Sequence, residues 1–209
     1  MIPSVLPTYS RAPLHFVKGE GTWLIEADGR RFLDLGAGIA VNALGHAHPA
    51  LVQTLTEQAQ KLWHVSNLYE IPQQQALADK LVAETFADTA FFCNSGTEAT
   101  LFAIRAARAF TGRDIFIKMD GGYHGCHDAV EVNIFADPNS ADSAVKHIGP
   151  GVSASVLEDV RSVPFNDLDA VEETLSADNH RIAAIIVEPM LNAGGLVPAR
   201  PGYLAGLRR

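Results

Sequence analysis

The chain has 209 residues, of which 47% are hydrophobic and 19% charged, so it can form a folded core and is not a disordered chain. Its 16 Lys and Arg against 24 Asp and Glu give a net charge of −8, and this balance offers no electrostatic footprint for nucleic acid or an anionic membrane. The longest aliphatic run covers residues 182–187, far short of the roughly 20 residues that a membrane helix needs.

Residues 1–65 predict a hairpin and a helix after an extended arm. The arm, residues 1–21, is rich in Pro and Gly. Residues 23–27 and 30–35 flank an Asp-Gly pair, which favours a tight turn with positive φ, so they predict a hairpin. Pro49 and the spacing of apolar residues after it predict a helix that reaches about residue 62.

From residue 66 onward, short apolar strands alternate with helices. We predict strands at residues 89–93, 115–119 and 182–187, and helices at residues 72–86, about 99–110 and about 167–175. This alternation predicts an α/β fold with a mostly parallel sheet. Residues 137–161 have weak periodicity and predict a long loop.

The two cysteines, Cys93 and Cys126, are too few for a disulfide framework, so a reducing compartment is expected. Residues 1–10 lack a charged region followed by an apolar block, and no secretory signal is predicted. Together these features predict a cytoplasmic protein.

The turn between the strand at 89–93 and the following helix is the most informative stretch. It contains Ser95, Gly96 and Thr97, directly before a strongly helical run. Helix N-termini carry unpaired N–H groups and a partial positive charge, which suit a phosphate group. The alternative is a capping box formed by Ser95 and Glu98 without a ligand, and the two interpretations are compatible.

Residues 94–99, Asn-Ser-Gly-Thr-Glu-Ala, resemble the phosphate-binding turn of class III (ornithine-type) aminotransferases, which use pyridoxal 5′-phosphate. Further motifs follow in the family's order: residues 28–34, 38–49, 64–69, 122–125 and 187–189. The first half is similar to the acetylornithine branch. Residues 121–128 and 163–168 are more similar to glutamate-1-semialdehyde aminomutases.

This resemblance implies a pyridoxal-phosphate-dependent transferase of fold type I. Residues 1–65 would be an amino-terminal arm and part of the small domain, and residues 66–209 the amino-terminal half of the large cofactor-binding domain. The intact enzyme would be a homodimer that transfers an amino group between an amino compound and a 2-oxo acid, or within one substrate.

The resemblance also implies a set of site residues. The cofactor would contact Ser95, Gly96, Thr97, Tyr123, His124 and Glu188. Tyr123 would lie flat against the pyridine ring, although an ordinary loop aromatic is the alternative. Glu188 would lie near the cofactor pocket or be a solvated residue at a strand end. Arg11 would bind a substrate carboxylate or be a surface arginine.

Two histidine-containing clusters look superficially like metal ligands. They are His46 with His48, and His124 with Cys126 and His127. Neither comes with a second pair that would complete a tetrahedral site, so no metal is predicted.

Several positions depart from the family's pattern. Cys126 stands where the ornithine and acetylornithine branch commonly has an arginine that pairs with the substrate carboxylate, so the amino donor and acceptor stay open. The family's Schiff-base lysine and the aspartate that pairs with the pyridine nitrogen lie downstream of the matched segment, and no lysine here lies in a matching motif. We therefore expect an amino-terminal half with no catalytic residue of its own and no turnover alone. A non-catalytic phosphate-binding module and half of a split enzyme are the alternatives.

Overall fold

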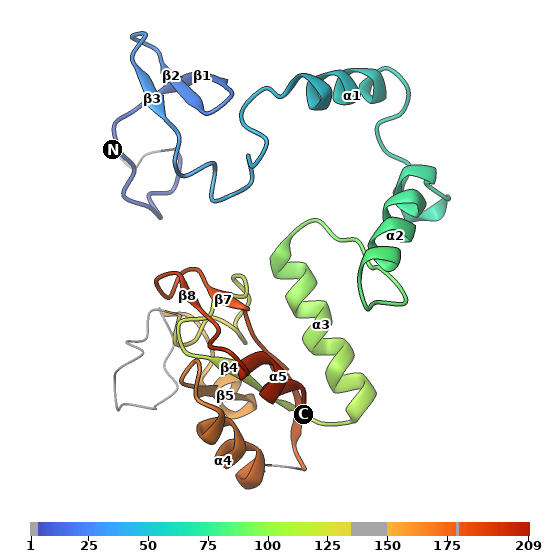
Figure 1. The fold of residues 1–209 in the computed structure, drawn as a ribbon, viewed down its shortest axis with the longest axis vertical. Helices are drawn as coiled ribbons and strands as arrows, with labels where there is room; N and C mark the ends of the chain where they lie inside the picture. Colours follow the sequence, from blue (N-terminus) through green and yellow to red (C-terminus); the bar gives the residue numbers. More distant parts are fainter. Residues whose placement is uncertain (1–3, 135–149, 179) are drawn as a thin grey trace. The chain divides into compact units, whose positions relative to one another are not determined.

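The structure is a computed structural model that describes residues 4–134, 150–178 and 180–209. The chain divides into two compact units, Met1–Leu77 and Ala78–Arg209 (Figure 1). None of the described helices is long and apolar enough to cross a membrane. The assignment of residues 1–65 and 66–209 to two domains of an intact enzyme stays a prediction.

The first unit contains a three-stranded antiparallel sheet and two helical segments. The sheet has the order β1-β2-β3, and the elements of the unit are β1 (Phe16–Glu20), β2 (Trp23–Glu26), β3 (Arg31–Leu33), α1 (Pro49–Ala59) and η1 (Ser66–Leu68). Gly29 has φ +89°, as the predicted tight turn between β2 and β3 requires. The hairpin and the helix are confirmed. The prediction of an extended arm over residues 1–21 was wrong at its end, because Phe16–Glu20 form β1 and pair with β2.

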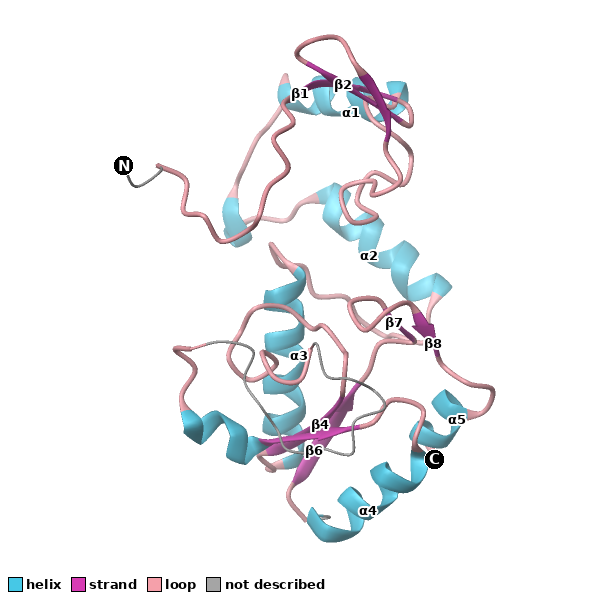
Figure 2. Ribbon diagram, turned by 90° about the vertical axis from the view of Figure 1, so that its left-hand side faces the viewer, coloured by secondary structure: helices cyan, strands magenta, loops and turns pink. Residues whose placement is uncertain are grey.

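The second unit is built on a parallel sheet with the order β5-β4-β6. Helix α2 (Pro72–Glu84) lies at the junction of the two units in the sequence. The elements that follow are α3 (Gly96–Thr111), β4 (Ile115–Met119), η2 (Ala154–Asp159), β5 (Val160–Val163), α4 (Leu168–Asp178), β6 (Ile182–Ile186), β7 (Met190–Leu191), β8 (Val197–Pro198) and α5 (Tyr203–Arg208). Figure 2 shows α3, α4 and α5 around β4 and β6. The α/β class and the parallel sheet are confirmed.

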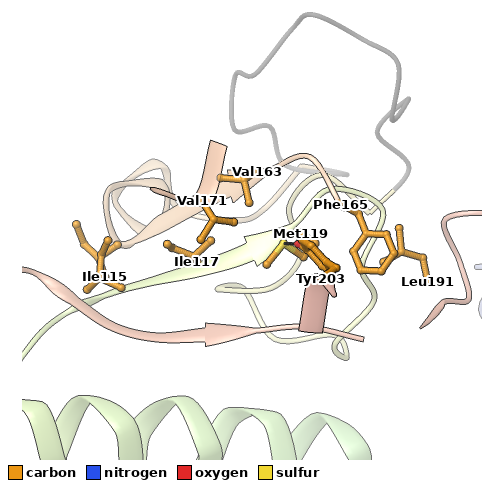
Figure 3. Packing of buried hydrophobic residues seen from close by; sticks show 9 residues of the cluster. Ile115, Ile117, Met119, Val163, Phe165, Val171, Leu191 and Tyr203 are labelled. Carbon is orange, nitrogen blue, oxygen red and sulfur yellow. Dashed lines mark hydrogen bonds between the residues drawn. The ribbon is translucent and has the colours of Figure 1, made fainter. Parts of the chain in front are cut away.

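Strand β4 is the centre of the core and is buried along its whole length. Ile115, Ile117 and Met119 belong to a cluster that includes Val171 of α4 and Tyr203 of α5 (Figure 3). The alternate residues of β4 point to the other face, where a second cluster contains Phe116 together with Ile104 of α3, Val130, Val132 and Val160. The alternation expected of a strand therefore separates a face covered by α4 and α5 from a face covered by α3.

Two sequence-based predictions in this unit were wrong. Residues 89–93 were predicted as a strand but have no strand structure, and no described strand pairs with them. Phe91 is 69% exposed, with its ring 5.0 Å from that of Phe102 on α3. A strand needs a hydrogen-bonded neighbour to persist, so propensity alone did not determine this segment. The predicted loop at 137–161 contains η2 and the start of β5, and its residues 137–149 lie outside the described residues.

Candidate functional site

The turn before α3 is a capped helix N-terminus. The Ser95 backbone is extended, and its Oγ accepts a hydrogen bond from the N–H of Glu98 at 3.2 Å. The Glu98 carboxylate accepts one from the N–H of Asn94 at 2.6 Å. The Ser95 half of the predicted capping box is therefore confirmed, whereas the Glu98 carboxylate reaches back to the N–H of Asn94 and not to that of Ser95. This cap leaves the N–H groups of Gly96 and Thr97, the first two in the helix, without an intrahelical acceptor.

The space around Gly96 is open, because an added Cβ there would meet no atom within 4 Å. An anion in this space would face the N–H groups at the positive end of the α3 dipole. Capping and phosphate binding are thus compatible at this turn.

We expect the Ser95→Ala substitution to destabilise the chain by about 1 kcal/mol, because the N–H of Glu98 would lose its acceptor. The matched control is Ser176→Ala, which removes the hydroxyl of an exposed serine inside α4. It should leave stability unchanged or raise it, since alanine has the higher helix propensity. Urea denaturation of both variants measures the difference, and equal midpoints would contradict a stabilising cap.

A second segment, residues 120–133, leaves the end of β4 and returns to it; we call it the Tyr-His loop because it carries Tyr123 and His124. The N–H of Gly121 donates to the carbonyl of Asn133 at 2.8 Å and closes the base of the loop. Its two ends are therefore held together beside the strand.

The Tyr-His loop packs against the first turn of α3. The Thr100 hydroxyl donates to the carbonyl of His124 at 2.6 Å, and the N–H of Cys126 donates to Thr97 Oγ1 at 3.2 Å. Gly125 has φ +103°, and a Cβ there would lie only 2.6 Å from Thr97 Oγ1 and 2.8 Å from Thr97 Cα. The close approach therefore requires glycine. Two motifs that are separated in sequence meet at one turn.

Glu188, which follows β6, holds the same loop from another side. Its Oε1 accepts a hydrogen bond from the N–H of Tyr123 at 2.8 Å, and its Oε2 accepts one from the N–H of Asn192 at 3.4 Å. The side chain of Tyr123 is partly exposed, and its hydroxyl lies 3.2 Å from Cys126 Sγ. Glu188 is therefore a loop anchor rather than a freely solvated carboxylate.

His124 is buried and neutral. Only 7% of the residue is exposed, and no described residue gives its Nε2 a hydrogen-bond partner. Burial, followed by the positive charge of Lys118 and the nearby His127, lowers the pKa of His124 to about 4. At neutral pH its imidazole is thus an uncharged group with one nitrogen unused by the described residues.

A buried polar cluster beneath the loop was missed by the sequence analysis. Lys118 is fully buried, and its Nζ donates to the carbonyl of Val132. Asp120 Oδ1 accepts hydrogen bonds from Asn133 Nδ2 at 2.9 Å and from the hydroxyl of Ser162. Burial lowers the pKa of Lys118 to about 8. The available signal was a lysine within the otherwise apolar strand Ile115–Met119, because a lysine there must be paired.

The six residues that were expected around the cofactor lie in the connected region formed by the α3 turn, the Tyr-His loop and Glu188. The hydroxyl of Ser95 differs from the expectation, because it accepts the hydrogen bond of the helix cap. Arg11 is exposed and belongs to the first compact unit, so its role stays a prediction. Within residues 4–134, 150–178 and 180–209, no three His, Cys, Asp or Glu side chains gather as a metal site would require.

Solved structures similar to this fold include transaminases and an aminomutase. An omega-transaminase from Sphaerobacter thermophilus superposes with a TM-score of 0.88 at 31% identity, covering 96% of this chain and 46% of that one. A transaminase with pyridoxal phosphate bound gives a TM-score of 0.86 at 29% identity, covering 96% and 46%. A glutamate-1-semialdehyde aminomutase from Pseudomonas aeruginosa gives 0.81 at 27%, covering 94% and 42%. The fold is that of the fold type I pyridoxal-phosphate-dependent transaminases.

Sequence comparison identifies the family to which the chain belongs. The class-III aminotransferase family model matches residues 6–209, and the chain belongs to this family. The acetylornithine aminotransferase of Rhodobacter capsulatus is 51% identical, over 100% of this chain and 51% of the relative. That of Mesorhizobium japonicum is 44% identical, over 97% and 49%. The chain spans about half the length of the curated relatives it matches.

The cofactor of this family is pyridoxal phosphate, and the residues present fit its phosphate end. The N–H groups of Gly96 and Thr97, the open space at Gly96 and the positive end of α3 together suit a phosphate. The described lysines fit the aldehyde end of the cofactor less well than the α3 turn fits its phosphate. Lys118 is fully buried and committed to Val132, while Lys80 is exposed on α2.

Proposed function

We propose that this chain supplies the phosphate-binding half of a pyridoxal-phosphate-dependent aminotransferase. The intact enzyme transfers an amino group between an amino acid or amine and a 2-oxo acid. When bound, the cofactor supplies an electron sink for that reaction. The observation that carries the proposal is the packing of the Tyr-His loop, through Cys126 and His124, on the helix turn that presents Gly96 and Thr97.

Each site residue has a distinct task in this proposal. Gly96 and Thr97 bind the phosphate through their N–H groups, while Ser95 holds the helix start in shape. Tyr123 covers the pyridine ring of the cofactor. Glu188 fixes its backbone in the Tyr-His loop, while its side chain is partly exposed and able to stack. The residues therefore bind and orient the cofactor without moving a proton.

The neutral imidazole of His124 excludes water behind the loop, since the residue is buried and lies against Gly122. A Cβ at Gly122 would lie 3.0 Å from His124 Nε2, so the two residues leave no room for solvent between them. Arg11 binds the substrate carboxylate in this proposal, as a guanidinium does well.

We further propose that the intact enzyme is a homodimer in the cytoplasm. The free, exposed cysteines Cys93 and Cys126 support a reducing compartment. Four apolar side chains in the first unit are largely exposed and support burial against another polypeptide: Leu35, Ile39, Val41 and Leu44. The alternative that this chain binds the cofactor without catalysis is supported by Lys118, because its amine donates to the carbonyl of Val132. We therefore expect cofactor binding but no transamination from the purified 209-residue chain.

The test is equilibrium dialysis of the purified chain with pyridoxal 5′-phosphate and, separately, with pyridoxal. We expect pyridoxal to bind at least about 10-fold more weakly, because it lacks the phosphate that the α3 turn holds. Thr97→Val should weaken binding of pyridoxal phosphate, since it removes the hydroxyl that fixes the N–H of Cys126. Thr111→Val is the matched control at the other end of α3.

Equal binding of the two compounds would contradict the proposal, as would an equal effect of the two threonine variants. Borohydride reduction followed by intact mass gives a second reading. A single defined lysine adduct together with amino transfer would contradict the expectation that the chain alone is inactive.

A further inference from the structure

Lys118 is an unusual residue for the middle of a central strand. It points to the same face of β4 as Phe116, where its other neighbours in the core are apolar. A charged amine in such a place costs several kcal/mol unless it is paired and hydrogen-bonded. A leucine or valine would cover the same face without that cost, so the amine needs a reason beyond packing.

The bonds of Lys118 lead to the Tyr-His loop. Its Nζ donates to the carbonyl of Val132, at the returning end of the loop. Its charge also interacts favourably with Asp120 and Glu188. Asp120 begins the loop and binds Asn133 near its end at 2.9 Å.

The second carboxylate, Glu188, completes the arrangement. It accepts the N–H of Tyr123 at 2.8 Å, in the middle of the loop. One buried cation thus donates to a carbonyl of the loop and, without an ion pair among the described residues, interacts electrostatically with both carboxylates that hold the loop. Loss of the cation would remove the bond to Val132 and the attraction to both carboxylates, so it would weaken the attachment of the loop at several points together.

We propose that Lys118 is a positioning residue, whose buried ammonium closes the base of the Tyr-His loop and thereby fixes Tyr123 and His124 over the start of α3. It touches no ligand, because it is fully buried. Its consequence for cofactor binding rests on the proposed function, whereas its effect on the loop is measured without any ligand.

The test is hydrogen–deuterium exchange of the 209-residue chain with three substitutions. Lys118→Met removes the charge and the donor at similar length, Lys118→Gln keeps an N–H donor, and Lys80→Met is the control at an exposed site on α2. We expect Lys118→Met to speed exchange in peptides of residues 120–133 by about 10-fold or more, with β5 and β6 changed less than about 2-fold. Lys118→Gln should restore only part of the protection, because its amide can donate to Val132 but carries no charge, and Lys80→Met should match the parent.

Three results would overturn the proposal. They are unchanged exchange in the loop of Lys118→Met, an equal rise in β5 and β6, and Lys118→Gln exchanging as slowly as the parent, which would show that the ammonium charge is not needed. If Lys118→Met fails to fold, Lys118→Gln carries the test, because it removes the charge at the same position while keeping a donor for the Val132 carbonyl. A local rise is then expected, and its absence overturns the proposal.

A ligand measurement separates this inference from the proposed function. Lys118→Met should weaken pyridoxal phosphate about 10-fold while binding of inorganic phosphate changes less than about 2-fold, since the turn at Gly96 is intact and only the ring side loses order. If the parent chain binds neither compound but exchange still rises in the loop, the proposed function fails and the role of Lys118 stands. Equal weakening of both compounds would contradict a role confined to the loop.

Discussion

Gly125→Ala is expected to release the Tyr-His loop from α3. The backbone of Gly125 has φ +103°, which an alanine adopts only with strain, and the new Cβ would lie 2.8 Å from Thr97 Cα and 2.6 Å from its Oγ1. The Cα of Thr97 is helix backbone, so this second obstacle cannot rotate away as the side-chain oxygen could. Strain and overpacking together should cost about 3 kcal/mol.

The matched control is Gly151→Ala. Gly151 has the same φ of +103°, but an added Cβ there would meet no atom within 4 Å. This variant therefore carries the conformational strain alone, about 1–2 kcal/mol. The difference between the two variants isolates the contact with Thr97.

Urea denaturation and the rate of thiol labelling at Cys126 measure the outcome. We expect Gly125→Ala to be the less stable variant and its Cys126 to react faster, because the bond from the Cys126 N–H to Thr97 would be lost. A Cys93→Ser background removes the other exposed thiol. Equal stability and equal labelling of the two glycine variants would show that the loop does not pack on α3.

The sequence predicted the parts of the site that are local. A capping box needs only Ser95 and Glu98, three residues apart, so the cap and the start of α3 could be read from residues in one turn. Strand Ile115–Met119 could also be predicted, since a buried parallel strand is a nearly continuous apolar run and only Lys118 interrupts this one. The family motifs added Tyr123, His124 and Glu188, but without the bonds that connect them.

What the sequence could not supply is pairing across long separations. Glu188 binds the Tyr123 backbone 65 residues earlier, and nothing near either residue indicates this contact. Ser162 reaches Asp120 from β5, a strand too short and too polar to be distinguished from a loop. Residues 89–93 show the opposite failure, because their apolar run predicts a strand that the described chain leaves unpaired. Propensity indicates a strand, but only a neighbour stabilises it.

Acid is expected to destabilise the second unit through His124. The folded state holds this imidazole neutral with a pKa of about 4, whereas an unfolded histidine titrates near 6.5. Between these values the unfolded chain binds the proton and the folded chain does not, so stability falls as pH decreases. The contribution is complete above pH 6.5 and is lost progressively toward pH 4. By linkage it amounts to about 2 kcal/mol at pH 5 and at most about 3 kcal/mol at lower pH.

The variant His124→Asn separates this effect from the titration of carboxylates. An asparagine cannot take up the proton, so its stability should fall less than that of the parent between pH 7 and pH 5, by about 2 kcal/mol. His64→Asn, at an exposed histidine in the first unit, should follow the parent. Urea denaturation of the three proteins at both pH values measures this. Parallel losses in the parent and in His124→Asn would mean that His124 is solvated in the folded chain, and the water-excluding role proposed for it beneath the Tyr-His loop would then fail as well.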